Sequence, residues 1–264
     1  MQSPSVDPAV IERGGLRFEQ NGPVATVTLS RPETKNSQTP HTWRALRAIG
    51  DALDPSVRVV VVRGDGDTFS SGLDRRMLTP AGLEGEGSIF DLLDLSDAEL
   101  ADLIGEWQEG VTWLGRDDIV SIAAVQGAAV GAGFQLALAC DLRVLADDAM
   151  LSMREAHYGL VPDIAGTKPL VALVGYSRAL ELCVTSRWVQ AREAAGLGLA
   201  TAVVPRDQLV ATVAELAAAL TAPAHGAVTA TKALLRSAEV LPLDEQRREE
   251  REAQIGRLRE LAGQ

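Results

Sequence analysis

Two glycine-framed segments contain the residues of this chain that are best suited to chemistry. They are Phe-Ser-Ser-Gly-Leu-Asp at residues 69–74 and Gly-Ala-Ala-Val-Gly-Ala-Gly-Phe-Gln at residues 127–135. Glycine lacks the Cβ that would keep a ligand away from the backbone, so bare N–H groups can approach one there. The second segment leads into an apolar stretch suited to a helix whose positive end would lie at the loop. Two N–H groups that converge on one oxygen would form an oxyanion hole.

The same glycines do not fit a nucleotide site. A dinucleotide fingerprint that began at Gly131 would need its third glycine where Leu136 stands, and one that began at Gly64 would need it at Phe69. The sequence contains no Gly-Lys-Ser/Thr phosphate loop, and no group of His, Cys and carboxylate residues has the spacing of metal ligands. We therefore expect neither a nucleotide-dependent enzyme nor a metal site.

Each glycine segment follows an apolar run that predicts a strand. Residues 57–63 precede the first segment, and residues 119–125 precede the second. Short, continuous apolar runs are typical of parallel strands that are buried on both faces. Upstream, residues 16–20 and 24–29 predict a hairpin around an Asn-Gly turn, and residues 40–53 predict a helix.

The order of the predicted elements indicates an α/β fold in two parts, residues 1–205 and 206–264. Strand, glycine loop and helix alternate through the first part, which is typical of parallel sheets with right-handed crossovers. Residues 79–97 show little periodicity, and we expect a mobile loop there. The second part contains only helical patterns. They cover residues 207–220, 226–240 and 243–261.

Composition places the chain among soluble globular proteins, with 46% hydrophobic and 23% charged residues. A net charge of −11 argues against a nucleic acid or an anionic membrane as a partner. No apolar stretch is long enough to span a bilayer, and residues 1–8 lack the basic and apolar regions of a signal peptide, so we expect a cytoplasmic protein. The two cysteines, Cys140 and Cys183, lie in apolar surroundings and are expected to be reduced thiols.

Short motifs occur in a characteristic order along most of the chain. They are Leu-Ser-Arg-Pro at 29–32 with Asn36, the two glycine segments, Leu-Ala-Leu-Ala-Cys-Asp-Leu-Arg at 136–143, Glu155, and Gly-Leu-Val-Pro at 159–162 followed by Gly166 and Thr167. In this order and spacing, the chain resembles the crotonase (enoyl-CoA hydratase/isomerase) superfamily. The resemblance implies a spiral of ββα turns with a C-terminal helical unit, assembled as a homotrimer or homohexamer. It also implies an acyl-CoA thioester substrate with no separate cofactor, while the reaction stays open.

By the same resemblance, the N–H groups of Leu73 and Ala132 would hold the thioester oxygen, with Gly72, Gly131 and Asp74 beside the substrate. The family usually has glycine where Ala132 stands, and the added methyl group would narrow the pocket. The loop at 79–97 would lie beside the acyl chain. Because coenzyme A is polyanionic, cations should gather around its phosphates. The candidates are Lys35, Arg31, Arg75 and Arg76, each of which could instead be an ordinary surface charge.

Positions 135 and 155 bear on the reaction. Two-base hydratases of the family have glutamate where this chain has Gln135, and glutamine cannot act as a general base, although it could orient water or the acyl chain. Glu155 stands at the second carboxylate position of the family. Burial should raise its pKa toward a range useful for proton transfer, unless it is a surface loop residue.

Asp163 follows the Gly-Leu-Val-Pro motif, where the family commonly has a small residue. It could replace the missing acid, since some family members with other chemistry have an aspartate in this neighbourhood. The simpler hypothesis is a helix N-cap ahead of Gly166 and Thr167.

A single glutamate fits double-bond isomerisation better than hydration, with Glu155 moving a proton between C2 and C4 of the acyl group. The sequence therefore predicts an acyl-CoA isomerase or lyase. Two alternatives stay open, a catalytically impaired acyl-CoA-binding protein and another crotonase-type reaction that uses Asp163.

Overall fold

An antiparallel hairpin begins the main sheet, as the Asn-Gly signal predicts. The computed structural model describes residues 6–263. Residues 1–5, part of the stretch at 1–8 that was expected not to be a signal peptide, lie outside the described residues. Helix α1 (Pro8–Arg13) precedes strands β1 (Leu16–Asn21) and β2 (Val24–Leu29), which pair with Asn21 opposite Val24. Gly22 adopts φ +57° in the connecting turn, a conformation that glycine reaches without strain.

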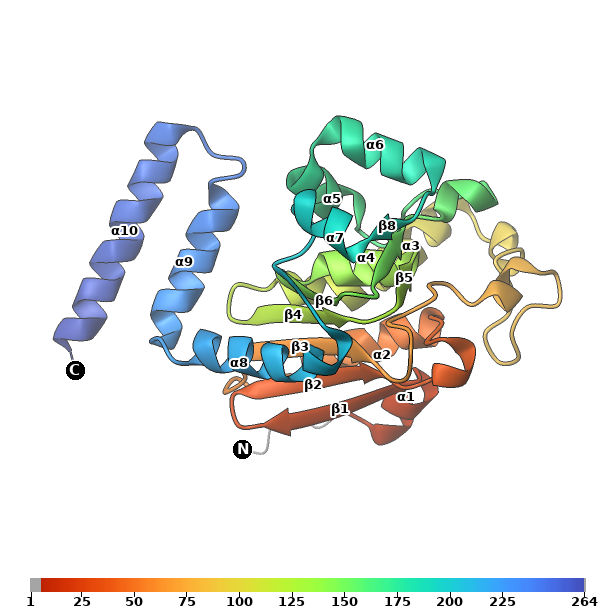
Figure 1. The fold of residues 1–264 in the computed structure, drawn as a ribbon, viewed down its shortest axis with the longest axis horizontal. Coiled ribbons are helices and arrows are strands. Elements are labelled where there is room, and N and C mark those ends of the chain that lie inside the picture. The colour runs from red at the N-terminus through yellow and green to blue at the C-terminus, as the bar shows by residue number, and fades with distance from the viewer. Residues whose placement is uncertain (1–5, 264) are drawn as a thin grey trace.

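Six strands form the main sheet, in the order β1-β2-β3-β4-β6-β9 (Figure 1). Every neighbouring pair from β2 onward is parallel, which confirms the parallel strands predicted before the two glycine segments. The remaining strands of this sheet are β3 (Val59–Gly64), β4 (Val120–Val125), β6 (Leu142–Ala146) and β9 (Ala202–Val204).

A second, three-stranded sheet has the order β5-β7-β8. Strand β5 pairs parallel with β7, and β7 pairs antiparallel with β8. The chain passes from one sheet to the other between β4 and β5 and returns at β6, so both sheets contribute to the turn that contains the second glycine segment. These strands are β5 (Ala128–Val130), β7 (Met150–Ser152) and β8 (Val189–Gln190).

Helices cover both faces of the main sheet (Figure 1). The helix predicted over 40–53 is α2. The loop predicted over 79–97 ends where α3 begins, at Asp97. A short 3-10 helix, Asp91–Asp94, lies inside that loop. The helices after α1 are α2 (Pro40–Asp51), α3 (Asp97–Thr112), α4 (Ala132–Ala139), α5 (Thr167–Val174), α6 (Tyr176–Thr185), α7 (Ala191–Gly196), α8 (Leu209–Thr221), α9 (His225–Ser237) and α10 (Leu243–Ala262).

Alternate side chains of β3 enter two different cores. Val60 and Val62 pack in the larger core with α2, α3 and α4, while Val59 and Val61 pack on the opposite face against α8. A strand buried on both faces needs no polar side, which explains its consecutive valines. Helix α8 belongs to the second predicted part of the chain but packs on the main sheet of the first part. The boundary at residue 205 stays a prediction.

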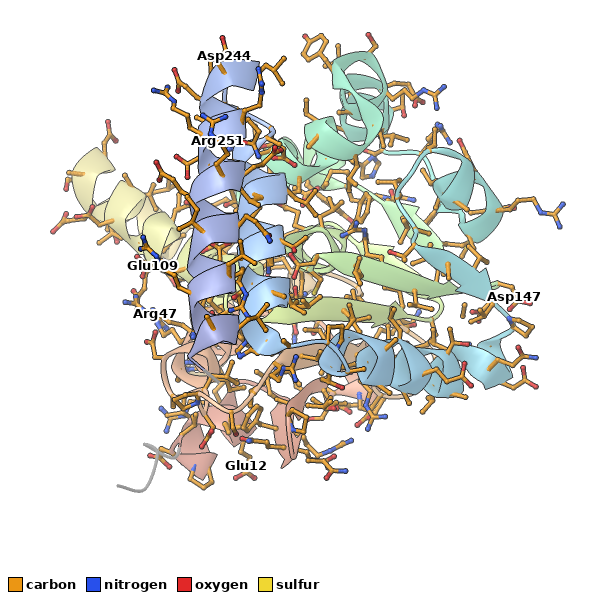
Figure 2. All side chains as sticks on the ribbon, turned by 90° about the vertical axis from the view of Figure 1, so that its left-hand side faces the viewer. Glu12, Arg47, Glu109, Asp147, Asp244 and Arg251 are labelled. Atoms are coloured by element: carbon orange, nitrogen blue, oxygen red, sulfur yellow. The ribbon has the colours of Figure 1, made fainter. Side chains whose placement is uncertain are left out.

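Helices α9 and α10 extend away from the sheets as a pair (Figure 1), and Figure 2 shows α10 beside α9, with Asp244 and Arg251 labelled on it. Lys232 links α9 to the main sheet region: its Nζ donates to Asp141 Oδ2 at 2.7 Å and to two backbone carbonyls.

Among the described helices, none alone is long and apolar enough to cross a membrane. The segments Arg206–Thr221 and His225–Ser237 reach that length and hydropathy only together, as a pair bent by 101°. Cys140 and Cys183 are free thiols, the first buried.

Candidate active site

The two glycine segments lie against each other. Ser70 N donates to Ala128 O at 3.0 Å, and Val130 N donates to Ser70 O at 2.9 Å, so the segments pair as a short parallel bridge. Gly72 adopts φ +80°, and a Cβ at this residue would lie 2.3 Å from Val130 O and 3.3 Å from Ala132 N. Only glycine allows this approach, which brings the two loops to one place.

The backbone N–H groups of Leu73 and Ala132 are the donors predicted to bind the substrate. Ala132 is the first residue of α4, so its N–H has no carbonyl partner within the helix. Leu73 lies between Gly72 and Asp74, whose backbone groups bond to Gln38, whereas no described residue accepts from the Leu73 N–H. Both residues line one cavity, so two unused donors are brought to the same wall.

This cavity has a volume of about 540 Å³ and walls of two kinds. Gly72, Leu73, Gly131 and Ala132 line one side together with Glu155 and Asp163. The other side is mostly apolar and comes from α2, α3 and the segment that follows Arg75. Its main residues are Trp43, Met77, Ile89, Leu92, Ile104 and Trp107. The loop predicted beside an acyl chain therefore does border the cavity.

Glu155 is buried beside the second glycine segment. Its side chain is 9% exposed, and a Cβ on Gly131 would lie 3.2 Å from its Oε1. Burial raises the pKa of the Glu155 carboxyl, and the nearby Asp163 carboxylate raises it further. Oε1 accepts a hydrogen bond from Gln135 Nε2 at 2.6 Å, while Oε2 has no partner among the described residues. The hypothesis of a surface loop glutamate is therefore wrong.

Gln135 holds Glu155 and has no free polar atom for the substrate. Its Oε1 accepts from the N–H groups of Ile164 at 2.9 Å and Gly166 at 3.2 Å. These two bonds fix the amide so that its NH₂ group faces Glu155. Gln135 is 1% exposed and is not part of the cavity lining. The amide of Gln135 therefore bonds to Glu155 and to two backbone groups, and the substrate contact predicted for it from the sequence is not found at the cavity lining.

Asp163 lines the cavity and does not cap a helix. Helix α5 begins at Thr167 with Gly166 as its N-cap, and no side chain bonds to that cap, so the N-cap hypothesis for Asp163 is wrong. Burial raises the pKa of the Asp163 carboxyl as well. Its backbone carbonyl accepts from Gln108 Nε2 of α3 at 2.8 Å. Two carboxyl groups with raised pKa values therefore share one cavity.

The predicted phosphate-binding cations separate into two pairs. Lys35 and Arg75 line the cavity, and Arg154, which the sequence analysis did not select, lines it too. Arg31 instead donates to Ser37 O at 2.5 Å, and Arg76 forms an ion pair with Asp74 at 2.7 Å. These two side chains bond to loop groups and do not line the cavity, and their contact with the phosphates stays a prediction.

Asp74 also serves the loop. Its carboxylate accepts from Arg76 and from Ser37 Oγ, and hydrogen bonds from Arg76 above all lower its pKa to about 2. The side chain is buried and is not part of the cavity lining, so the predicted contact of Asp74 with substrate is not found. An aspartate followed by two arginines was an available signal for such an internal ion pair.

Sequence reasoning missed the aromatic side of the cavity. Trp43 and Trp107 come from helices far apart in sequence, yet their ring centroids lie 5.2 Å apart. Trp188 also lines the cavity, with the Arg154 guanidinium 4.8 Å from its ring centroid. Nothing local in the sequence relates these residues.

Within residues 6–263, no group of three or more His, Cys and carboxylate residues could hold a metal ion.

Comparisons with known proteins indicate one enzyme family. A sequence model described as enoyl-CoA hydratase/isomerase matches residues 19–257. The chain is 33% identical over 236 residues to a carnitinyl-CoA dehydratase of Salmonella enteritidis PT4, a match that covers 87% of this chain and 83% of that protein.

Solved structures from Thermobifida fusca YX, described as an enoyl-CoA hydratase, are similar over the whole chain. The complex with CoA is 48% identical, with a TM-score of 0.93, and the match covers 100% of this chain and 99% of that one. The complex with acetoacetyl-CoA has the same identity and TM-score, over 98% of this chain and 100% of that one. These matches confirm the crotonase-type fold predicted from the sequence.

Proposed function

The chain belongs to the enoyl-CoA hydratase/isomerase family, whose members act on CoA thioesters, and from this premise we propose that it moves a double bond along an acyl-CoA. In the proposed reaction, a 3-enoyl thioester becomes a 2-enoyl thioester. The observation that carries this proposal is the Gln135–Glu155 pair, in which one carboxyl group can titrate and its partner cannot.

The glycine segments would supply the electrophilic part of the reaction. Removing a proton from C2 places negative charge on the thioester oxygen, and the N–H groups of Leu73 and Ala132 are the unused donors on that wall. Donors that are already fixed in place stabilise such charge without reorganising. Because Ala132 starts α4, the positive end of a helix also lies there.

Glu155 would carry the proton. Its carboxylate takes the C2 proton, the electron pair forms the enolate, and the protonated carboxyl group then returns the proton to C4 while the C3–C4 double bond shifts to C2–C3. A raised pKa suits this role, since the same group must be a base and then an acid. Oε2, which has no partner among the described residues, is the oxygen available to the substrate.

Hydration is less favoured because it needs a second group that holds and activates water. Gln135 does not titrate, and both polar atoms of its amide already bond to protein groups. A water at this position would have to displace one of those bonds.

The test compares the two reactions in one enzyme. Isomerisation of a 3-enoyl-CoA and hydration of the matching 2-enoyl-CoA are followed by the absorbance of the conjugated thioester, and we expect isomerisation to be faster. Gln135→Glu adds the missing titratable group and should raise hydration on the order of 10²-fold. A wild-type protein that hydrates faster than it isomerises would overturn the proposal.

A second candidate is a two-carboxyl reaction in which Asp163 acts with Glu155. It is supported by the position of Asp163 on the same cavity and by the raised pKa of its carboxyl group. In this case Asp163→Asn, which keeps the size of the side chain, should abolish turnover as completely as Glu155→Gln does. Under single-glutamate isomerisation, Asp163→Asn should cost much less.

We also propose that the protein is a homotrimer or homohexamer assembled through its C-terminal helices. Leu235, Leu243 and Leu258 on α9 and α10 are more than half exposed, which is unusual for leucines on a paired set of helices. Sedimentation of the wild type and of Leu258→Glu tests this assembly, and a monomeric wild type would contradict it.

A further inference from the structure

We propose that the acyl site continues into a second cavity, and that this cavity receives an oxygen-bearing distal end of the acyl group. The inference rests on the proposed function, because it requires the acyl group to occupy the cavity that contains Glu155. It names the substrate class as acyl-CoA thioesters whose chain ends in a hydrogen-bond-accepting oxygen.

The second cavity has a volume of about 400 Å³ and lies directly behind the apolar wall of the first. Met77, Leu92 and Trp107 line both cavities, so these three side chains are the partition between them. Methionine is unbranched and flexible, and Leu92 comes from the short 3-10 helix Asp91–Asp94, so the partition contains side chains that can move aside. A chain too long for the first cavity therefore meets a passage at this point.

The lining changes character across the partition. Apolar side chains dominate the near side, whereas His41, Arg44, Glu86 and Ser88 line the second cavity. Glu86 is engaged, since its Oε2 accepts from His41 N at the start of α2 at 2.9 Å. The Arg44 side chain is 42% exposed, and its Nε lies 3.7 Å from Glu106 Oε1. His41 also lines this cavity, and its ring bonds to no described residue. The Arg44 guanidinium is therefore the cationic donor of this lining that could meet an oxygen of the ligand.

Trp107 provides an independent sign of a polar ligand at the partition. Its side chain is 7% exposed, and its indole Nε1–H has no acceptor among the described residues. The neighbouring Trp43 has a partner, because its Nε1 donates to Gln38 Oε1 at 2.8 Å. A buried donor without an acceptor is costly, so an oxygen on the ligand would satisfy a group that the protein leaves unpaired.

The experiment compares substrates of matched length. Catalytic efficiency is measured for a short 3-enoyl-CoA, a long one that ends in a methyl group, and two of the same length that end in a hydroxyl or a carboxylate. We expect the wild type to prefer an oxygen-ended chain over the methyl-ended one by about tenfold, the value of one good hydrogen bond. The hydroxyl and carboxylate arms distinguish neutral from anionic ends, and Arg44→Gln should weaken only the carboxylate.

Leu103→Trp provides the matched variant, because Leu103 lines the second cavity and not the first. Filling that space should lower efficiency for the long substrates and leave the short one unchanged, while Trp107→Phe should remove the preference for oxygen. Equal efficiency for methyl-ended and oxygen-ended chains in the wild type, or an equal effect of Leu103→Trp on short and long chains, would overturn the inference.

Failure of the proposed function is separable from failure of this inference. If no thioester turns over, including the short one, the isomerase proposal fails on its own. Calorimetric binding of the saturated counterparts then gives the same comparison of chain ends, with the same expected preference and the same contradicting result.

Discussion

The two sides of the cavity that contains Glu155 are built in different ways. On the glycine wall, which we define as residues 69–74 and 127–135, backbone groups bond to backbone groups and Gln135 bonds to Glu155. On the acyl wall, residues 75–93 with α3, the lining is made of side chains, and Leu93 at its edge is 75% exposed. The glycine wall and Glu155, which packs against Gly131, hold the groups proposed for chemistry, and the acyl wall holds those proposed for selectivity.

This difference shows where precision is required. A hydrogen-bond donor or a proton carrier works only when it lies within a few tenths of an ångström of its position in the reaction. Such groups are therefore held by close backbone contacts that leave no room for an added side-chain atom. An acyl chain is bound by apolar area, which is not directional. Changes in the glycine wall should therefore have large effects, and changes at the edge of the acyl wall should have small ones.

The largest effect is expected at Glu155. Glu155→Gln keeps the size of the side chain and can still accept from Gln135, but it removes the group that titrates, so turnover of a 3-enoyl-CoA should fall about 10²-fold or more. Binding of a saturated acyl-CoA, measured by calorimetry, should persist. An active Glu155→Gln variant would mean that Asp163 or another group moves the proton.

The next effect concerns the contact between the glycine segments. Gly72→Ala and Gly85→Ala both place alanine in a left-handed conformation, with φ +80° and +78°. A Cβ at Gly72 meets Val130 O, whereas a Cβ at Gly85, on the acyl wall, meets nothing within 4 Å. We expect losses of about 3 and about 1 kcal/mol in the free energy of unfolding, respectively, measured with denaturant. Equal losses would show that the close contact contributes nothing.

The pH dependence of stability should reveal the buried carboxyl group. The pKa of Glu155 is higher in the folded state than its ordinary value of 4.5, so the unfolded chain releases this proton first as pH rises. Below pH 4.5 the carboxyl group is protonated in both states and does not change the free energy of unfolding. At neutral pH the unfolded chain has lost this proton, so the buried group lowers the free energy of unfolding. Relative to the wild type, Glu155→Gln should therefore gain stability between acidic and neutral pH in denaturant titrations. Glu249→Gln, at an exposed position of α10, is the control and should show no such gain.

The smallest effect is expected at the edge of the acyl wall. Leu93→Ser changes a side chain that is mostly in water, so the free energy of unfolding should change by no more than about 0.5 kcal/mol. Thermal unfolding of the variant and the wild type measures this. A loss as large as that expected for Gly72→Ala would mean that both walls are equally rigid.

The sequence was informative where local patterns determine structure. Consecutive valines predicted β3, the Asn-Gly pair predicted the first hairpin, and the glycine segments were placed correctly at the ends of buried strands. Leu73, Ala132 and Glu155, which the resemblance selected, line one cavity, and their roles stay predictions. Helix α3 was missed although Ser96 and Glu99 form a capping box, a signal that was present.

What the sequence did not reveal depends on contacts between distant residues. The orientation of Gln135 is set by N–H groups of Ile164 and Gly166, which the fold brings to it from another turn of the spiral. The Trp43–Trp107 contact and the partition at Met77 have the same origin. The periodicity of the sequence does not predict these contacts between distant residues, because they depend on how the helices pack on the sheets.

The fixed amide of Gln135 also bears on the fate of a hydrogen atom. With its oxygen held by two backbone donors, the amide cannot pass a proton onward, and Glu155 is shielded from water on that side. A deuterium that Glu155 removes from one face of C2 therefore has no exit through Gln135, and the acyl chain is the acceptor that the proposed reaction supplies. We therefore expect much of the isotope to reappear at C4, on the same face, with little washed out into the solvent. Complete loss of the label would instead indicate a path for protons that bypasses this amide.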